Sequence, residues 1–452
     1  MKNIKLDFSI VIFFVISFST IFVLIYNILY FNPILGYDAE AHFRYVDYLA
    51  RYLPREIKLP TQIETREFFN PPLGYLFPSL VQVFCRNLIN SNDLLSDCRP
   101  IYGNITQIFQ SIMYIATILI NLYTLKLFNK SKSIFNVSYL ILVSLLAVNY
   151  RTISMIRGEP YILFFLSLFL LIIYKAESNN YLFSFKSVFL SGLVIACIAL
   201  SRQWGFLLFI PLIILFFYKS QKRQYLVFWS LSAVIGALLS GWFYIGLYIR
   251  YGSFAAFNME SKGLSFTNQD PTFYFPSSAQ LTYLFSKPIR PNLDNQFFSI
   301  LYSDLWGDYW GYFTFTSRFL DIGRGQSSIG DYLARVNIVS IITSTIIIVF
   351  CYFSYKKYKS TLLIKYINLA FLTSIFGYLM FAIAYPNSTG DTIKSTYIIQ
   401  AFHLIVFLAS IYFNDLKKKN KKIFNTILLM FVIIYFHNFQ SYLSHFPFNY
   451  LL

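Results

Sequence analysis

The chain has 452 residues, of which 57% are hydrophobic and 13% are charged, well below the roughly 25% of charged residues in soluble domains. Repeated apolar runs of about 20 residues, ended by Lys, Arg or Pro, predict membrane-spanning helices and exclude a soluble domain or a membrane barrel. The formal net charge of +17 does not indicate a nucleic-acid-binding protein, because the positive residues fall mainly in short loops between the apolar runs.

The first apolar run extends from Phe8 to Phe31 and predicts an uncleaved first span, since it is too long for the core of a signal peptide. Ten further runs give a total of about eleven predicted spans and an all-α polytopic fold. They lie near 104–127, 134–150, 159–174, 187–201, 203–218, 226–249, 336–354, 364–384, 395–413 and 423–443.

The charges between these runs predict the orientation. A cytoplasmic N-terminus and an outer C-terminus place the lysine-rich short loops on the cytoplasmic side, as expected for a multi-pass protein of the cell membrane. In that arrangement only Asp7, Glu177 and Asp415 of the 20 acidic residues are cytoplasmic. We therefore expect the polar machinery on the outer face.

Two long outer segments divide the chain into three parts. Residues 1–249 are predicted to form a transmembrane catalytic module that includes the first outer loop, 32–103. Residues 250–335 form the second outer loop, and residues 336–452 form the C-terminal membrane helices.

The first outer loop begins with the acidic cluster Gly36-Tyr-Asp38-Ala-Glu40-Ala-His42. An amphipathic helix follows, which is predicted to lie along the membrane interface. Its apolar face consists of Phe43, Val46, Ala50 and Leu53, and its polar face of Arg44, Asp47, Arg51 and Arg55. A second juxtamembrane helix is expected to start at Pro71-Pro72 and to run through Leu73, Leu76, Leu80 and Val83.

Cysteines are few. Cys85 and Cys98 share the first outer loop, so they could form a disulfide, whereas Cys197 and Cys351 fall inside predicted spans.

The second outer loop is rich in aromatic and acidic residues, including the stretch Tyr302-Ser-Asp304-Leu-Trp306-Gly-Asp308-Tyr-Trp310. Such residues suit the faces and hydroxyls of sugars, but they also suit an interfacial aromatic belt. We favour the belt for most of them.

Several short motifs occur in a characteristic order. They are Asp38-Ala-Glu40, Asn70-Pro-Pro-Leu-Gly-Tyr75, Cys98-Arg-Pro100, Arg157-Gly-Glu159-Pro160, Ser201-Arg202-Gln-Trp-Gly205 and Asp391-Thr-Ile-Lys394-Ser-Thr-Tyr397. In this order the chain resembles the GT-C superfamily of polytopic glycosyltransferases, which includes protein O-mannosyltransferases and aminoarabinose transferases. The resemblance covers roughly residues 1–220 and 385–410.

This resemblance implies inverting transfer of a sugar from a polyprenyl-phosphate donor to a hydroxyl group of a lipid, glycan or protein acceptor on the outer face. The residues support a lipid-borne donor independently. Nucleotide sugars are cytoplasmic, and the sequence contains no Gly-rich loop of the kind that cradles phosphates.

Such a reaction needs a base, and Asp38 matches the first-loop acid of the family. We predict that Asp38 is the catalytic base, with Glu40 as its companion in the catalytic pair. The alternative is that Asp38 caps the following helix and that Glu40 favours its first turn. His42 shares a helix face with Asp38; it could orient the acid or bind a metal, although a simple interfacial histidine is favoured.

The departing phosphate needs cations, and Arg202, Lys394 and Arg157 are predicted to bind it. The alternative for Arg202 and Lys394 is snorkelling to lipid headgroups. Lys394 stands where the related motif more usually has Arg.

A divalent cation is a further option, held by Asp38 and Glu159. Glu159 could instead pair with Arg157 or Arg151 without any metal.

Two other functions remain open. An O-antigen polymerase or ligase is also polytopic and has arginines for a lipid diphosphate, but it would need neither the acidic cluster nor the Pro-Pro turn. A transporter or flippase of lipid-linked saccharides would carry charges near the centres of its spans, which are nearly free of charge here.

Overall fold

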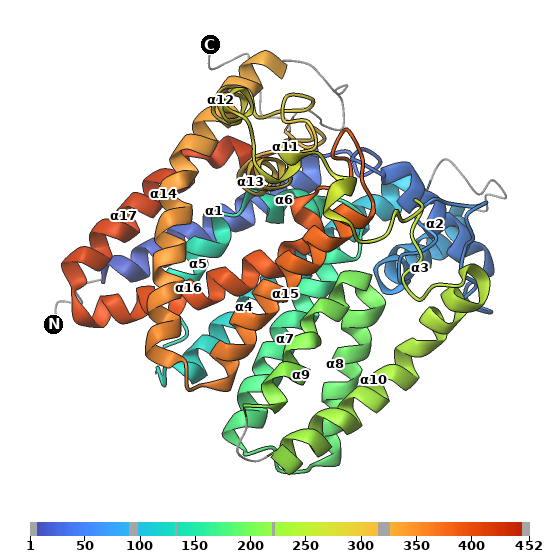
Figure 1. The fold of residues 1–452 in the computed structure, drawn as a ribbon, viewed down its shortest axis with the longest axis horizontal. Helices are drawn as coiled ribbons and strands as arrows, with labels where there is room; N and C mark the ends of the chain where they lie inside the picture. The colour runs from blue at the N-terminus through green and yellow to red at the C-terminus, as the bar shows by residue number, and fades with distance from the viewer. Residues whose placement is uncertain (1–6, 90–97, 132, 219–221, 315–325, 445–452) are drawn as a thin grey trace.

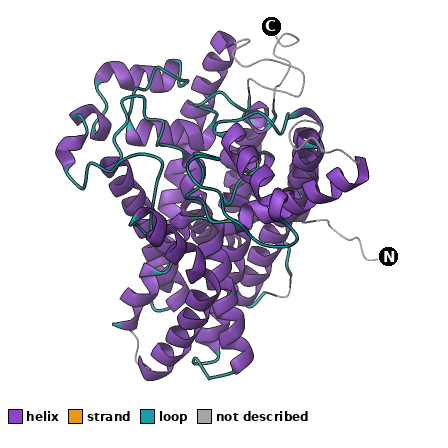
Figure 2. Ribbon diagram, turned by 90° about the vertical axis from the view of Figure 1, so that its right-hand side faces the viewer, coloured by secondary structure: helices purple, strands orange, loops and turns teal. Residues whose placement is uncertain are grey.

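The computed structural model describes residues 7–89, 98–131, 133–218, 222–314 and 326–444. Over these ranges the regular secondary structure is entirely helical, and the longest helices form one bundle with most of the loops gathered at one end (Figures 1 and 2). The helical fold class predicted from composition is therefore confirmed.

Among the described residues, seven helical segments are long and apolar enough to cross a membrane. They are α1 (Phe8–Tyr30), α4 (Arg99–Phe128), α7 (Glu159–Ser178), α10 (Lys222–Tyr251), α14 (Gln326–Tyr358, apolar from Ile329), α15 (Leu362–Ala384) and the 3-10 turn η3 (Ser395–Ile398) with α16 (Ile399–Lys419). Each coincides with a predicted span, which makes the chain a multi-pass membrane protein.

The other four predicted spans do not form single long apolar helices in the structure, so the count of eleven is not confirmed. The run 134–150 forms two short helices, α5 (Val137–Ser144) and α6 (Ala147–Ser154), bent by 67°. The runs 187–201 and 203–218 form α8 (Phe185–Ser201) and then η1 (Gln203–Leu208) with α9 (Ile210–Phe216), and 423–443 forms α17 (Lys421–His437) and η4 (Phe439–Tyr442). None of these helices exceeds 17 residues, the lower end of the roughly 17–25 residues of a spanning helix, although the bent pair α5 and α6 could together form one span.

One hydrophobic core joins all three parts of the chain. It contains Ile16 from α1, Phe297 from the second outer loop and Phe407 from α16. The boundaries at residues 249 and 335 therefore mark where an outer segment begins and ends in the sequence. They do not separate the core, because side chains from all three parts of the chain pack together in it.

The first outer loop folds into two packed helices, α2 (Ala39–Tyr52) and α3 (Leu73–Ile89). The helix predicted to start at Pro71-Pro72 is present, but it begins just after the two prolines, at Leu73. Phe43, Val46 and Ala50 of α2 are buried inside the protein, whereas the sequence predicted that this apolar face lies along the membrane interface. Leu53 lies beyond the helix end.

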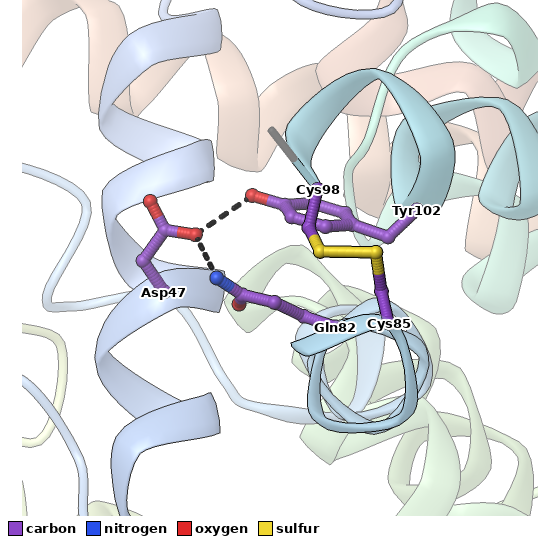
Figure 3. The surroundings of a disulfide bond; sticks show 5 residues. All are labelled: Asp47, Gln82, Cys85, Cys98 and Tyr102. Carbon is purple, nitrogen blue, oxygen red and sulfur yellow. Dashed lines mark hydrogen bonds between the residues drawn. A yellow bond between two sulfur atoms is a disulfide. The ribbon is translucent and has the colours of Figure 1, made fainter. Parts of the chain in front are cut away.

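Asp47 corrects the predicted polar face of α2, because it is buried rather than exposed. Its carboxylate pairs with Arg99 at 2.6 Å and accepts hydrogen bonds from Gln82 and Tyr102 (Figure 3). Beside it, Cys85 of α3 and Cys98 at the start of α4 form a disulfide (Figure 3). The loop is thus attached to α4 by a covalent bond and by a partly buried ion pair.

The second outer loop contains η2 (Phe266–Asn268), α11 (Pro271–Tyr274), α12 (Ser278–Ser286) and α13 (Phe297–Trp306). The interfacial belt favoured for its aromatic stretch is wrong for Trp306, Tyr309 and Trp310, because all three are buried. They pack inside the protein, where an interfacial belt would face lipid headgroups.

The two ends of the bundle differ in charge. Lysines occupy the last turns of α4, α7, α14 and α16, at residues 126, 175, 356–357 and 417–419. Lys417 and Lys421 also pair with Asp7, so the start of α1 lies at this lysine-rich end. At the opposite end, where α2 and α3 lie, α4 begins at Arg99, α7 at Glu159 and η3 at Ser395.

Candidate active site

Asp38 lies between α1 and α2, in the left-handed conformation with φ 63°. Its side chain makes no capping hydrogen bond to α2, so the capping alternative is not realised. One carboxylate oxygen accepts from Lys394 Nζ at 2.7 Å and the other from Arg66 at 2.6 Å. Asp38 and Lys394, which are far apart in sequence, therefore meet as the motif order predicts for one site.

These cations control the ionisation of Asp38. Burial alone would raise the pKa of Asp38, but the charge and hydrogen bond of Lys394, with a smaller contribution from Arg66, hold that pKa well below its ordinary value. Burial opposes the charge on Lys394, whereas Tyr397 and Asp38 raise the pKa of Lys394 above its ordinary range. Both groups are charged at neutral pH.

A second pair lies at the junction of three motifs. Arg202, the single extended residue between α8 and η1, pairs with Glu159 at 2.7 Å and donates another hydrogen bond to the side chain of Asn70. Glycines allow this convergence. A Cβ on Gly158 would overlap the carbonyl oxygen of Ser201, and one on Gly74 would come within 2.8 Å of the Cα of Gly158.

Arg157 is fully buried at 0% exposure, yet it has few partners. It donates one long hydrogen bond of 3.5 Å to Thr396 Oγ1, and its guanidinium carbon lies 4.6 Å from the centre of the Tyr37 ring. No carboxylate lies within ion-pair distance of Arg157 in the described part of the chain. A buried charge with so little compensation is costly unless an anion joins it.

Three neighbouring cavities lie in this part of the molecule. The first, of about 650 Å³, is lined by Asp38, Glu40, Arg66, Glu67, Trp310 and Lys394, among others. It shares Phe69, Phe257 and Tyr397 with a second cavity of about 210 Å³ that contains Arg202.

The third cavity shares Phe206 with the second and is an apolar groove of about 390 Å³ between α8, η1, α9 and α10. Its lip is open, since the side chain of Ile213 is 68% exposed. The polar cavity, the smaller cavity lined by Arg202 and the apolar groove on the outside of the bundle are therefore neighbours that share wall residues.

Glu67 is a site residue that the sequence did not indicate. It lines the first cavity but is itself buried, and it accepts a hydrogen bond from Asn70. Burial first, and then the charge of Asp38, raise the pKa of Glu67. Two carboxyl groups of one cavity thus have pKa values shifted in opposite directions, a pattern common in acid–base sites. Its only sequence signal is its position three residues before the Asn70-Pro-Pro turn.

Glu40 and His42 differ in their exposure to solvent. Glu40 lines the cavity but is 55% exposed, and it pairs with Arg44 and Arg99. His42 is buried and its Nδ1 lies 2.7 Å from the Tyr75 hydroxyl, so the interfacial interpretation of His42 is wrong. Burial lowers the pKa of His42, which keeps the ring neutral at physiological pH.

The proposed metal ligands are occupied by cations: Asp38 by Lys394 and Arg66, and Glu159 by Arg202. Glu159 pairs with neither of the arginines considered from the sequence. In the described ranges no group of three or more His, Cys, Asp or Glu side chains could hold a metal ion. The arrangement of these two carboxylates does not fit a divalent cation.

A buried network of hydrogen bonds and an ion pair holds the segment that contains Lys394. Asp304 pairs with Arg151 at 2.9 Å and accepts hydrogen bonds from the backbone and hydroxyl of Ser395 at 2.7 and 2.6 Å. Arg151 also donates to the carbonyl oxygen of Gly307. This network fixes the residue next to Lys394 to the second outer loop, and the sequence did not indicate it.

Comparison of the chain with protein-family models, with curated proteins and with solved structures gave no significant match.

Proposed function

We propose that this protein is a membrane glycosyltransferase that moves a sugar from a polyprenyl-phosphate donor to a hydroxyl group of a lipid, glycan or protein acceptor. The resemblance of its motifs to the GT-C superfamily suggests this reaction. The geometry of the site supports it through its charges, its cavities and the state of Asp38.

The observation that carries the proposal is a group of three buried cations. One of them, Lys394, contacts Asp38 and also lies against the rings of Tyr37 and Tyr397, which Arg157 and Arg202 contact in turn. Arg157, Arg202 and Lys394 are 0%, 4% and 6% exposed, and the carboxylates paired with them are those of Asp38 and Glu159. Arg157 has no such partner among the described residues, which leaves an excess of positive charge. A phosphate group is the anion that this excess suits, because Arg binds it through a planar fork and Lys as a point charge.

The apolar groove supports a lipid-linked donor. With the phosphate near Arg202, a polyprenyl chain could extend along α8, α9 and α10 and leave toward the bilayer past Ile213. A nucleotide donor would need no such groove.

In the proposed reaction the oxygen of the acceptor hydroxyl attacks the anomeric carbon of the sugar. The bond between that carbon and the phosphate oxygen breaks, polyprenyl phosphate leaves, and Asp38 takes the proton of the hydroxyl. Attack from the side opposite the phosphate inverts the anomeric configuration. Arg202, Lys394 and Arg157 stabilise the negative charge on the leaving phosphate, and Glu40 lies at the mouth of the same cavity.

We assign the cavity to the outer face of the membrane and the N-terminus to the cytoplasm. This orientation follows from the lysines at the opposite end of the helices, which are expected on the cytoplasmic side.

The test uses purified full-length protein in vesicles, a polyprenyl-phosphate sugar, and a membrane extract as the source of acceptor. We expect release of polyprenyl phosphate, and a loss of roughly 100-fold or more for Asp38→Asn. Lys356→Ala, at the other end of the molecule, is the control and should keep the full rate.

Full activity of a folded Asp38→Asn protein would contradict the role of Asp38. Transfer from a nucleotide sugar would contradict the lipid donor. Movement of the lipid-linked sugar across the vesicle membrane, without release of polyprenyl phosphate, would indicate a transporter instead.

A further inference from the structure

A separate cavity lies at the lysine-rich end, where the turn between α14 and α15 faces away from α2 and α3 (Figure 1). Its volume is about 700 Å³. Its lining comes from the end of α9, the end of α14 and the start of α15, and consists of Leu215, Tyr218, Tyr355, Lys359, Ser360, Lys365, Asn368, Leu369 and Leu372. The proposed transfer reaction makes no use of this cavity.

The polar part of the lining is suited to an anion. Lys359 and Lys365 both line the cavity, with the Ser360 hydroxyl and the Asn368 amide as further hydrogen-bonding groups, and none of the lining residues that the structure describes is a carboxylate. Lys365 Nζ lies 5.5 Å from the centre of the Tyr218 ring, which holds this ammonium group at the wall.

The nearby acids do not neutralise these lysines in the described structure. Asp415 pairs with Lys357 at 2.6 Å and accepts a hydrogen bond from Tyr358. Glu177 accepts hydrogen bonds from the backbone N–H groups of Leu362 and Leu363, at the start of α15. Both carboxylates are thus engaged outside the cavity lining, and the positive charge of the cavity remains.

The apolar part of the lining continues onto the outside of the bundle. Leu372 is 58% exposed and Tyr355 is 42% exposed, although each belongs to a candidate membrane-spanning helix. Leu372 lies seven residues beyond Lys365 on α15, about 10 Å further into the membrane. A ligand that fills the cavity therefore needs a negative head beside an apolar portion.

We propose that this cavity binds the phosphate headgroup of an anionic phospholipid, with its acyl chains along Leu369 and Leu372. Basic pockets between membrane helices at one face of a bilayer bind lipids of this kind. The two lysines pair with the phosphate, and Ser360 and Asn368 contact the polar part of the headgroup. The site does not depend on the glycosyltransferase function.

The experiment measures the thermal unfolding midpoint of the full-length protein in an uncharged detergent. Short-chain phosphatidylglycerol is titrated, with short-chain phosphatidylcholine, glycerol phosphate and inorganic phosphate as separate arms. We expect a saturable rise in the midpoint with phosphatidylglycerol alone. The double variant K359A/K365A should weaken its apparent affinity by roughly tenfold or more, because two charge-assisted contacts are lost.

The control is K356A/K418A, which removes two exposed lysines of the same end that do not line the cavity. It should leave the affinity unchanged. A second variant, Leu372→Asn, keeps both lysines and should weaken phosphatidylglycerol binding through the acyl chains.

Several outcomes would overturn the proposal. Equal loss in both double variants would mean that the lipid responds only to overall surface charge. A rise of the same size with glycerol phosphate or inorganic phosphate would mean a site for a soluble anion. No rise with phosphatidylglycerol would mean no anionic lipid site.

Discussion

The two ends of the helix bundle carry positive charge in different ways. At the end that contains Asp38, called the cavity end below, Arg157, Arg202 and Lys394 are almost completely buried. At the other end, Lys356, Lys359 and Lys418 are exposed. Both ends are basic in sequence, so charge alone does not distinguish them.

The difference shows which charges the fold must compensate. An exposed lysine is solvated and costs little, and its position reports the orientation of the chain. A buried arginine needs carboxylates, carbonyl groups or a bound anion, because desolvation of an unpaired ion costs several kcal/mol. At the cavity end these partners come from segments far apart in sequence, so each buried cation joins several parts of the molecule.

The largest effect is expected for Glu159→Gln. This change leaves the buried guanidinium of Arg202 without its carboxylate and should destabilise the protein by about 3–5 kcal/mol. Unfolding of the purified protein in mixed micelles measures this loss. Lys356→Ala, the control from the exposed end, should change stability by less than about 0.5 kcal/mol. Equal effects of the two variants would remove the distinction between the ends.

The next effect concerns the disulfide, which fastens the first outer loop to α4 at the cavity end. It closes a loop of sequence separation 13. Cys85→Ser should therefore reduce stability by about 2–4 kcal/mol. Cys351→Ser, at a buried free cysteine, is the control for loss of a thiol alone. Wild-type stability for the Cys85→Ser protein in oxidising buffer would show that this bond does not hold the loop.

A third prediction concerns pH. Lys394 holds the pKa of Asp38 below its ordinary value, so the wild-type carboxylate stays ionised as pH falls into the mildly acidic range. In Lys394→Gln, burial becomes the dominant influence and raises the pKa of Asp38. The acid limb of the kcat/KM profile should move to higher pH by about one unit or more. Lys356→Gln, the control, should leave the acid limb unchanged. An unchanged acid limb in Lys394→Gln would show that this limb does not report the ionisation of Asp38.

The smallest effect is expected at Asp7. A hydrogen bond from Lys417, outweighing burial, lowers the pKa of Asp7 from 3.8 to about 2. Its contribution is therefore complete above pH 3.8 and is lost as pH falls through about 2. Asp7→Asn should cost about 1 kcal/mol or less at neutral pH, because the pair is partly solvated. Stability curves of the two proteins should converge at the acidic end; a constant difference would exclude this ion pair.

The sequence predicted the seven long spanning helices because length and hydropathy determine them, but it also predicted four further spans that the structure does not confirm. It did not predict the bend between α5 and α6, since Leu145 and Leu146 at the break are apolar and no Pro or Gly marks it. The polar half, α6, carries Arg151, whose partner Asp304 lies 153 residues away. Such a pairing leaves no local pattern.

For the site, motif order brought Asp38, Arg202 and Lys394 into one hypothesis, and the fold places Asp38 against Lys394 and Arg202 in the neighbouring cavity. Glu67 was missed because a single glutamate in a polar loop looks like any solvated residue. For Glu159 the sequence suggested a metal shared with Asp38, or a pair with Arg157 or Arg151. The fold instead brings Arg202 to it by tertiary packing, which leaves no local pattern.

An experimental structure with polyprenyl phosphate bound tests the lipid-donor site most directly. We expect the phosphate within about 3 Å of the Lys394 or Arg202 side chain, and the polyprenyl chain along the groove between α8, α9 and α10. A phosphate bound away from the Asp38 cavity, with that groove empty, would contradict the proposed donor site.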